Sequence, residues 1–305
     1  MEFLTLAIVL ITILSVGVFG NVSIVIATYR KKHLKTKIHL MVCIMSMMDL
    51  ISIGFEFSSA IRMLLGVEAM SRQKCFRFLW IYMVVHNAEM VIALAVALDR
   101  VVAVHFPVRY SQTSARATLP IVLLIAFIVG AAPVAAALFA IDDEIIPACN
   151  PPLAFPRQLY FYWNGLIVLL SLSILVTYAA VFVQMHRLEK MRKNIRQLRI
   201  TKALASTIVA YAFTKFTAVT ATFFLPLLIH DINVTDTLAT YVVILVSIEY
   251  GINYWLLLMR KDDTYRRAFL EQVGLSKVAP KEAWTSEGQL TRIVPREGRR
   301  TSVRF

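Results

Sequence analysis

The sequence predicts an all-α membrane protein, a bundle of seven transmembrane helices. Its 305 residues are 58% hydrophobic, whereas soluble domains contain about 45–50% apolar residues. About 20 apolar residues cross the hydrocarbon core of a bilayer as a helix, and the chain has seven runs at least that long. These runs do not alternate strictly between apolar and polar residues, as the strands of a membrane barrel would. The predicted spans are residues 3–29, 38–64, 75–104, 117–140, 158–186, 201–230 and 237–260.

The placement of positive charge predicts the orientation of this membrane domain. We assign residues 1–271 to the domain and the basic residues 272–305 to a disordered cytoplasmic tail. Lys and Arg gather in the links 30–37 and 187–202 and from residue 260 to the end, which hold five, seven and eleven of them. Such links stay in the cytoplasm, so we expect the N-terminus outside a plasma membrane. The net charge of +13 thus reflects the orientation of the chain in the membrane, and no nucleic-acid partner is predicted.

Two of the three cysteines lie on the predicted outer side. Cys75 opens the third span and Cys149 follows the fourth, so both face an oxidising compartment in which disulfides form. A bridge between them would tie the second outer loop to the top of the third span, and two free thiols are the alternative. Cys43 lies inside the second span and is interpreted as a packing residue.

Polar residues interrupt the spans on one face in particular. In the third span, Tyr82, His86, Glu89, Ala93 and Arg100 follow helical spacing and share one face. Because ionisable residues are costly in a membrane, such a face is expected to look into the bundle.

Three acids are predicted to lie in one layer of the membrane. At about 1.5 Å of rise per residue, Asp49, Glu89 and Glu249 fall at similar depth. Three carboxylates in a low dielectric cannot all stay ionised unaided. The hypothesis is a sodium or proton site; the alternative is a set of protonated acids that only hydrogen-bond between helices. No other cofactor is predicted. Lys215 lies near the same depth, where snorkelling toward the cytoplasm is the expected behaviour.

A short motif closes the third span and carries a resemblance to a known family. Asp99, Arg100 and Val101 follow Cys75 by about the spacing at which the third helix of rhodopsin-like G-protein-coupled receptors runs from a disulfide cysteine to its Asp/Glu-Arg-Tyr motif. Further positions match in order: Asn21, Asp49, Cys149, Tyr178, Phe224–Pro226, Asn253, and the short amphipathic eighth helix at 260–269. Within that family, the stretches around Lys74–Tyr110 and Tyr265–Phe269 resemble nematode serpentine receptors of class SX, which are chemoreceptors.

The resemblance implies a mechanism in which Arg100 pairs with Asp99 at rest and contacts a heterotrimeric G protein in the active state. Tyr178 and Asn253 would belong to the same switch. The chain departs from the family pattern at Phe224, which replaces the tryptophan of helix six, and in helix seven, where the proline is missing. These departures put the family's helix-six and helix-seven switches in doubt.

The ligand is expected to enter from outside, between the helices, and to be a small molecule or a short peptide. The position that carries an aspartate in amine receptors is Tyr82 here, which disfavours an amine bound in their way, although Glu56 could hold a cationic group. The candidate pocket residues are Glu56, Tyr82, Met83, His86, Tyr162, Trp163, Phe224, Leu227 and Leu228.

The predicted function is therefore that of a chemosensory G-protein-coupled receptor in the lipid bilayer. A seven-helix transporter or ligand-gated channel is the alternative, since it would explain the intramembrane acids. It would not explain Cys75, Cys149 and the Asp99–Arg100 pair at their places. No enzymatic activity is predicted, because no nucleophile lies beside a base in the pattern.

Overall fold

The structure, a computed structural model, describes residues 3–67, 69–106, 108, 110, 114–190, 195–259 and 263–274. Its long helices are α1 (Leu4–Arg30), α2 (Lys37–Leu64), α3 (Arg72–His105), α5 (Ala115–Leu138), α7 (Arg157–Lys190), α8 (Ile195–Leu228) and α9 (Ile232–Met259). Within the described residues, six of them are long and apolar enough to cross a membrane. The seventh, α8, has a shorter apolar part at Ala212–Leu228. The predicted all-α membrane class is confirmed.

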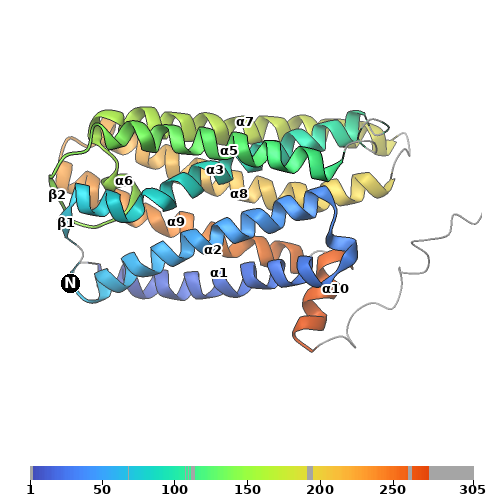
Figure 1. Cartoon of the computed structure of the whole chain (residues 1–305), viewed down its shortest axis with the longest axis horizontal. Coiled ribbons are helices and arrows are strands. Elements are labelled where there is room, and N and C mark those ends of the chain that lie inside the picture. Colours follow the sequence, from blue (N-terminus) through green and yellow to red (C-terminus); the bar gives the residue numbers. More distant parts are fainter. Residues whose placement is uncertain are drawn as a thin grey trace, which may run out of the picture.

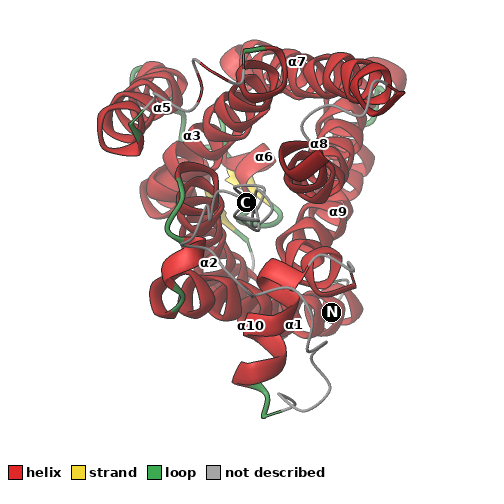
Figure 2. Cartoon of the chain, turned by 90° about the vertical axis from the view of Figure 1, so that its right-hand side faces the viewer, coloured by secondary structure: helices red, strands yellow, loops and turns green. Residues whose placement is uncertain are grey.

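The long helices lie side by side, and seen from one end α1, α2, α3, α7, α8 and α9 form a ring, with α5 packed against the outside of α3 (Figures 1 and 2). α3 packs against α2, α5, α7 and α8, and α1 closes the ring by packing against α2 and α9. The N-terminal end of α1 lies at the same end of the bundle as β1 (Met70–Ser71), β2 (Ile145–Ile146) and α6 (Pro151–Ala154). β1 and β2 pair antiparallel, with Met70 opposite Ile146. The 3-10 turn η1 (Lys32–Leu34) and α10 (Asp263–Gln272) lie at the other end.

Apolar residues cover the outside of the bundle as well as its interior. Leu124 and Ile128 in α5 and Val176 in α7 are large apolar side chains that are about 60% exposed. A helix that is apolar all round suits a membrane, because lipid solvates its outer face. The outside of the helices is thus built for contact with lipid.

Glycines allow two pairs of helices to approach closely. A Cβ atom added at Gly130 in α5 would lie 2.8 Å from the backbone nitrogen of Ala88 in α3. One added at Gly20 in α1 would lie 2.7 Å from Cβ of Tyr254 in α9. Small residues at helix crossings are a common device in membranes, where close packing replaces the hydrophobic effect between helices.

The short helix α10 docks on the bundle by one face, as the predicted amphipathic eighth helix should. Its Tyr265 and Phe269 are buried, and the Phe269 ring lies 4.6 Å from the ring of Tyr254 in α9. Arg267 on the opposite face is exposed. Gln272 donates a hydrogen bond to the carbonyl of Ser23 in α1. Residues 275–305, which make up nearly all of the predicted tail, lie outside the described residues.

One ion pair near the C-terminal end of α10 predicts that the stability of the protein depends on pH. Lys31 pairs with Glu271, and this hydrogen bond lowers the pKa of Glu271. Because the pKa is lower in the folded state, the pair stabilises the fold at pH values above the unfolded-state glutamate pKa of about 4.3. This stability is lost as the pH falls through the folded-state pKa. Since the pair is partly exposed, we expect it to contribute about 0.2–1 kcal/mol to the free energy of unfolding. Thermal melting of the wild type and Glu271→Gln should differ near neutral pH and converge in acid; a constant difference would contradict the prediction.

Candidate functional site

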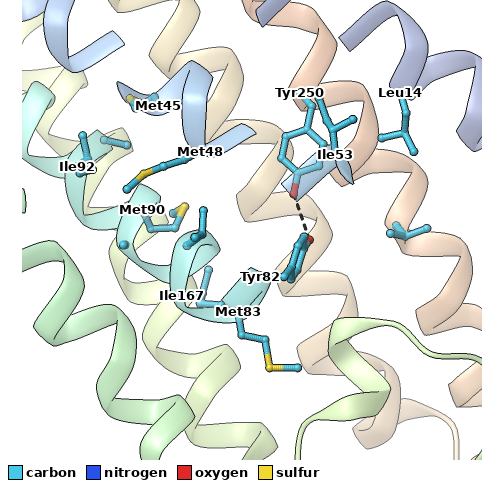
Figure 3. Packing of buried hydrophobic residues seen from close by; sticks show 14 of the residues in the cluster. Leu14, Met45, Met48, Ile53, Tyr82, Met83, Met90, Ile92, Ile167 and Tyr250 are labelled. Carbon is cyan, nitrogen blue, oxygen red and sulfur yellow. Dashed lines mark hydrogen bonds between the residues drawn. The ribbon is translucent and has the colours of Figure 1, made fainter. Parts of the chain in front are cut away.

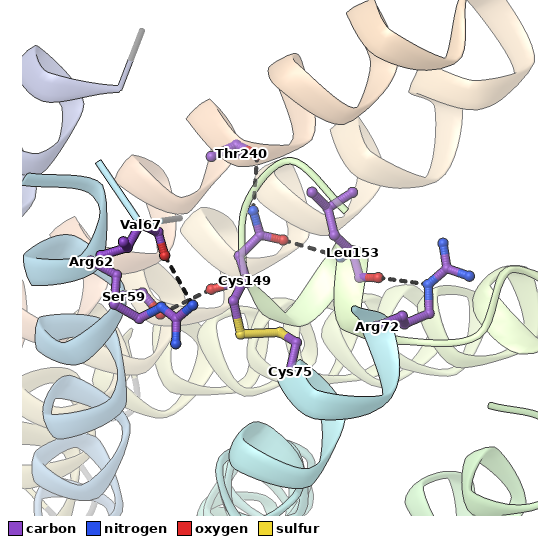
Figure 4. The surroundings of a disulfide bond; sticks show 9 residues. Ser59, Arg62, Val67, Arg72, Cys75, Cys149, Leu153 and Thr240 are labelled. Atoms are coloured by element: carbon purple, nitrogen blue, oxygen red, sulfur yellow. Dashed lines mark hydrogen bonds between the residues drawn. A yellow bond between two sulfur atoms is a disulfide. The ribbon is translucent and has the colours of Figure 1, made fainter. Parts of the chain in front are cut away.

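A disulfide fixes a cap over the end of the bundle at which α1 begins. Cys75 at the start of α3 is bonded to Cys149 (Figure 4), which confirms the predicted bridge. The cap, defined as residues 145–155, is held by further contacts. Ser59 in α2 donates a hydrogen bond to the carbonyl of Cys149 at 3.0 Å, and Asn150 donates to Oγ1 of Thr240 in α9 at 2.9 Å. The cap is thus tied to three different helices.

Asn150 also explains why a short helix forms in the cap. Its side-chain oxygen accepts a hydrogen bond from the backbone nitrogen of Leu153 at 3.1 Å, and Pro151 occupies the first helical position. An asparagine cap followed by proline is a favoured way to begin a helix.

Buried Arg72 adds an ion network to the cap that the sequence alone did not indicate. The guanidinium donates to the carbonyl of Leu153 at 3.0 Å, to Asp142 at 2.6 Å and to Glu144 at 2.7 Å. Arg157 at the start of α7 shares Glu144 at 2.9 Å. Arg72 and Arg157 also line an outer cavity of about 390 Å³ between the cap, α7, α8 and α9. The sequence predicted that these charges lie on one side of the membrane but could not pair them.

A smaller inner cavity of about 50 Å³ lies beneath the cap. Four predicted pocket residues line it: Glu56 from α2, Tyr82 and His86 from α3, and Trp163 from α7. Trp163 is fixed by a hydrogen bond of 3.0 Å from its indole nitrogen to Asn87. The structure therefore brings together residues from three of the predicted spans.

The other predicted pocket residues require a correction. Met83 is buried but does not line the inner cavity. Four more lie on the outside of the bundle, with exposed fractions of 78% for Tyr162, 47% for Phe224, 54% for Leu227 and 75% for Leu228.

The surface of α8 that faces the inner cavity lies nearer the middle of the helix. Ala218, Val219 and Thr222 line the cavity there, whereas Phe224, the residue matched to the family's helix-six tryptophan, is exposed. Lipid is as apolar as the bundle interior, so an apolar helix gives no hydrophobic signal of which face turns inward.

The three predicted acids come together in one place, named here the acid cluster. Asp49, Glu89 and Glu249 are fully buried, and one oxygen of each lies within 4.8 Å of the others. They come from α2, α3 and α9, so helix packing places them together.

Lys215 lies inside the acid cluster, and its predicted snorkelling is wrong. The side chain has no exposed surface. Nζ lies 3.1 Å from Glu249 Oε2 and 3.8 Å from Glu89 Oε2. The physical reason is that these carboxylates, supplied by two other helices, stabilise the ammonium without its reaching water. A predicted sodium site thus already contains one fixed positive charge.

Contacts between side chains connect the acid cluster to the inner cavity. Nζ of Lys215 lies 3.1 Å from Nδ1 of His86, and the His86 ring stacks on Tyr82 at 5.7 Å between centroids. The hydroxyl of Tyr82 lies 3.1 Å from that of Tyr250 in α9 (Figure 3). His86 therefore connects the wall of the inner cavity with Lys215 in the acid cluster.

At the opposite end from the cap, Arg100 and Asp99 form a buried ion pair. Two more residues complete what we call the Arg100 cluster. Tyr110 accepts a hydrogen bond from Arg100 at 2.6 Å and donates one to Asp99 at 3.1 Å. Lys37 at the start of α2 lies 2.7 Å from Asp99. Burial raises the pKa of Tyr110, which keeps its hydroxyl able to donate and accept.

The remaining residues of the predicted switch are placed only in part. Tyr178 in α7 is buried. Asn253 lies in α9, but its side chain is outside the described residues. Asn21, matched to the asparagine of helix one, donates to the carbonyl of Tyr250 at 2.8 Å. Sequence reasoning missed Lys37, because it is one of five basic residues in the link 30–37 and charge alone does not distinguish it from the others.

A capped cavity at one end of seven helices and a buried arginine pair at the other are the arrangement of a G-protein-coupled receptor. The chain belongs to the family described as serpentine type 7TM GPCR chemoreceptor Srsx, whose pattern matches residues 14–273. It is also similar to the D(2) dopamine receptor A of Xenopus laevis, with 24% identity over 204 residues. That match covers 65% of this chain and 44% of the dopamine receptor, so the chain spans less than half the length of this relative. The predicted receptor class and chemosensory family are confirmed.

Proposed function

We propose that this receptor binds a small ligand in the inner cavity and activates a heterotrimeric G protein at the Arg100 cluster. The single observation that carries this proposal is the contact of Lys215 with both His86 in the cavity wall and Glu249 in the acid cluster. A ligand can shift an equilibrium only by contacts that differ between two states. A ligand that contacts His86 would act on Lys215 and on Glu89. Glu89 lies between His86 and Arg100 along α3.

The proposed orientation follows from charge, with the cap outside and the Arg100 cluster in the cytoplasm. The link between α1 and α2 and the helix α10 carry basic residues at the Arg100 end. The acidic Asp142 and Glu144 lie at the cap end. The positive-inside rule places the basic end in the cytoplasm, where a G protein and anionic lipid are found.

The size of the inner cavity supports a small molecule over a short peptide. A volume of about 50 Å³ admits only a few water molecules, since each needs roughly 10–15 Å³. A peptide would have to open the cap, which is tied to α2, α3 and α9. The similarity to a dopamine receptor supports an amine among the small molecules.

We propose that the acid cluster is completed by protons or one sodium ion in addition to Lys215. Three carboxylates exceed the single ammonium, and uncompensated charge in a low dielectric is costly. Protonated acids that hydrogen-bond between helices are the alternative. A titration of receptor stability with sodium and pH tests the proposal, and indifference to both would exclude it and leave the alternative.

The coupling role of the Arg100 cluster predicts opposite effects for two variants. Tyr110→Phe removes two hydrogen bonds that hold Arg100 and Asp99 in place. If their net worth is about 1.4 kcal/mol, basal G-protein activity rises about tenfold. Adding Arg100→Ala should abolish that activity, because the guanidinium itself is removed. Guanine nucleotide exchange on added G protein, in membranes that contain the full chain, measures both effects.

Tyr29→Phe is the matched control, since Tyr29 is an exposed tyrosine at the same end of the bundle. We expect it to leave nucleotide exchange unchanged. Basal exchange that survives Arg100→Ala would contradict the proposal. A transporter or channel would instead give ligand-dependent flux or current without G protein, and the same cells can be tested for it.

A further inference from the structure

Glu56 is a buried carboxylate in the wall of the inner cavity with which no described residue forms an ion pair. It is 2% exposed, and it forms no ion pair within the described part of the chain. Tyr82 is its hydrogen-bonding neighbour. Its Oε1 atom is buried and accepts no hydrogen bond from any residue that the structure describes. Burying a carboxylate without a counter-charge is costly, so this placement destabilises the empty receptor.

The buried ammonium of Lys215 is engaged elsewhere. It contacts Glu249 and Glu89 and lies 3.1 Å from His86. Two carboxylates therefore share its charge already, and neither belongs to the cavity wall. Lys215 acts on Glu56 only through its electric field, and no described cation forms an ion pair with Glu56, so the side chain is free to pair with a cationic ligand.

His86 gives the same cavity a hydrogen-bond donor. An ammonium has donors only, so Nδ1 of His86 accepts from Lys215 and the ring carries its proton on Nε2. The ring lines the cavity. Trp163 and Tyr82 line the same cavity with aromatic rings, whose faces attract cations.

We propose that the inner cavity binds a short-chain alkylamine, with its ammonium group paired to Glu56. This inference deepens the proposed function and rests on it. The volume of about 50 Å³ corresponds to about four water molecules, and hence to a compact amine of about that many heavy atoms. Val219 and Val243 line the same cavity and suit the alkyl part. The acid that binds the amine is on α2, whereas Tyr82 stands at the α3 position where amine receptors carry their aspartate.

The test measures thermal stabilisation of the purified full-length receptor by isobutylamine, with isobutanol as the neutral probe of equal size and isobutyrate as the anion. We expect isobutylamine to raise the melting temperature, isobutanol to raise it much less and isobutyrate to leave it unchanged. A ligand this small reaches at best about micromolar affinity. Glu56→Gln keeps the size of the side chain and removes its charge. It should weaken isobutylamine binding about 10- to 100-fold, the usual range for a hydrogen bond to a charged group.

Two further variants make the result decisive. Asp143→Asn, which removes the charge of an exposed acid between α5 and β2, should leave the isobutylamine response intact. Glu56→Asp keeps the charge, so a preference for amine over alcohol should persist at lower affinity. The proposal is overturned if isobutanol stabilises the wild type as well as isobutylamine does, or if Glu56→Gln binds the amine unchanged. No G protein is present in this assay, so such a failure leaves the coupling proposal standing, and failure of the nucleotide-exchange test leaves this one standing.

Discussion

Replacing Lys215 with methionine is expected to lower the free energy of unfolding by about 3–5 kcal/mol, the range for removing one partner from a buried ion pair. Methionine nearly matches the length of the side chain but lacks the charge. Glu89, Glu249 and Asp49 would then face one another without any fixed positive charge. The loss comes mainly from these stranded carboxylates, because an uncompensated buried charge costs more than a missing contact.

Thermal melting of the purified receptor measures this effect, and a second variant tests its cause. Lys215→Met combined with Glu249→Gln removes one of the stranded carboxylates, so part of the lost stability should return. Lys31→Met is the matched control, because it breaks a partly exposed lysine–glutamate pair and should cost at most about 1 kcal/mol.

The same variant separates the two readings of the acid cluster. Without the ammonium, a sodium ion gains room among three carboxylates, which are ligands that suit a hard cation. Sodium chloride should therefore stabilise Lys215→Met more than N-methyl-D-glucamine chloride does, and should affect the wild type less. Equal stability of Lys215→Met and the wild type would show that Lys215 is not the counter-charge of the cluster.

Removing the disulfide by Cys75→Ser and Cys149→Ser is expected to cost about 2–5 kcal/mol of stability. The bridge joins residues 74 positions apart, and without it the chain between them gains freedom in the unfolded state. The cap would keep its hydrogen bonds to Ser59, Arg72 and Thr240 but lose its covalent link to α3, so we expect it to separate from the bundle more often and to open the inner cavity.

The third cysteine provides the control for this prediction. Cys43→Ser changes a free cysteine of intermediate burial and should change the melting temperature much less than the double variant. Melting temperature and the fraction of receptor at the cell surface are the two measurements. If the double variant has the same melting temperature as the wild type, the cap is held by its other contacts and not by the disulfide.

Much of the fold was predictable from the sequence because the membrane imposes strong local rules. A span needs about 20 apolar residues, and basic links mark the cytoplasmic side. Polar residues in a span also carry information, since their cost in lipid makes them face the interior. Glu56, Tyr82 and His86 were predicted in this way, and all three line the inner cavity. Asp49, Glu89 and Glu249 were placed in one layer by counting the helical rise, and they do lie together.

Apolar and aromatic residues gave no comparable signal. Tyr162 and Trp163 are neighbours in the sequence, yet Tyr162 is exposed while Trp163 lines the inner cavity. The face of α8 was misplaced for the same reason, since Phe224 points outward and Val219 lines the inner cavity. Either face of an apolar helix is stable against lipid, so packing against neighbouring helices decides which one turns inward.

The sequence by itself determined the membrane class, the long apolar helices and the common depth of Asp49, Glu89 and Glu249, whereas the side on which each basic link lies stays a prediction. Only the tertiary structure decided the partners: Lys215 with the acid cluster, Lys37 and Tyr110 with Asp99, and Arg72 with the outer loop. The physical reason is distance. The cost of placing a charge in lipid is a local property of the residue, whereas its neutralisation depends on which other helix stands within a few ångströms of it.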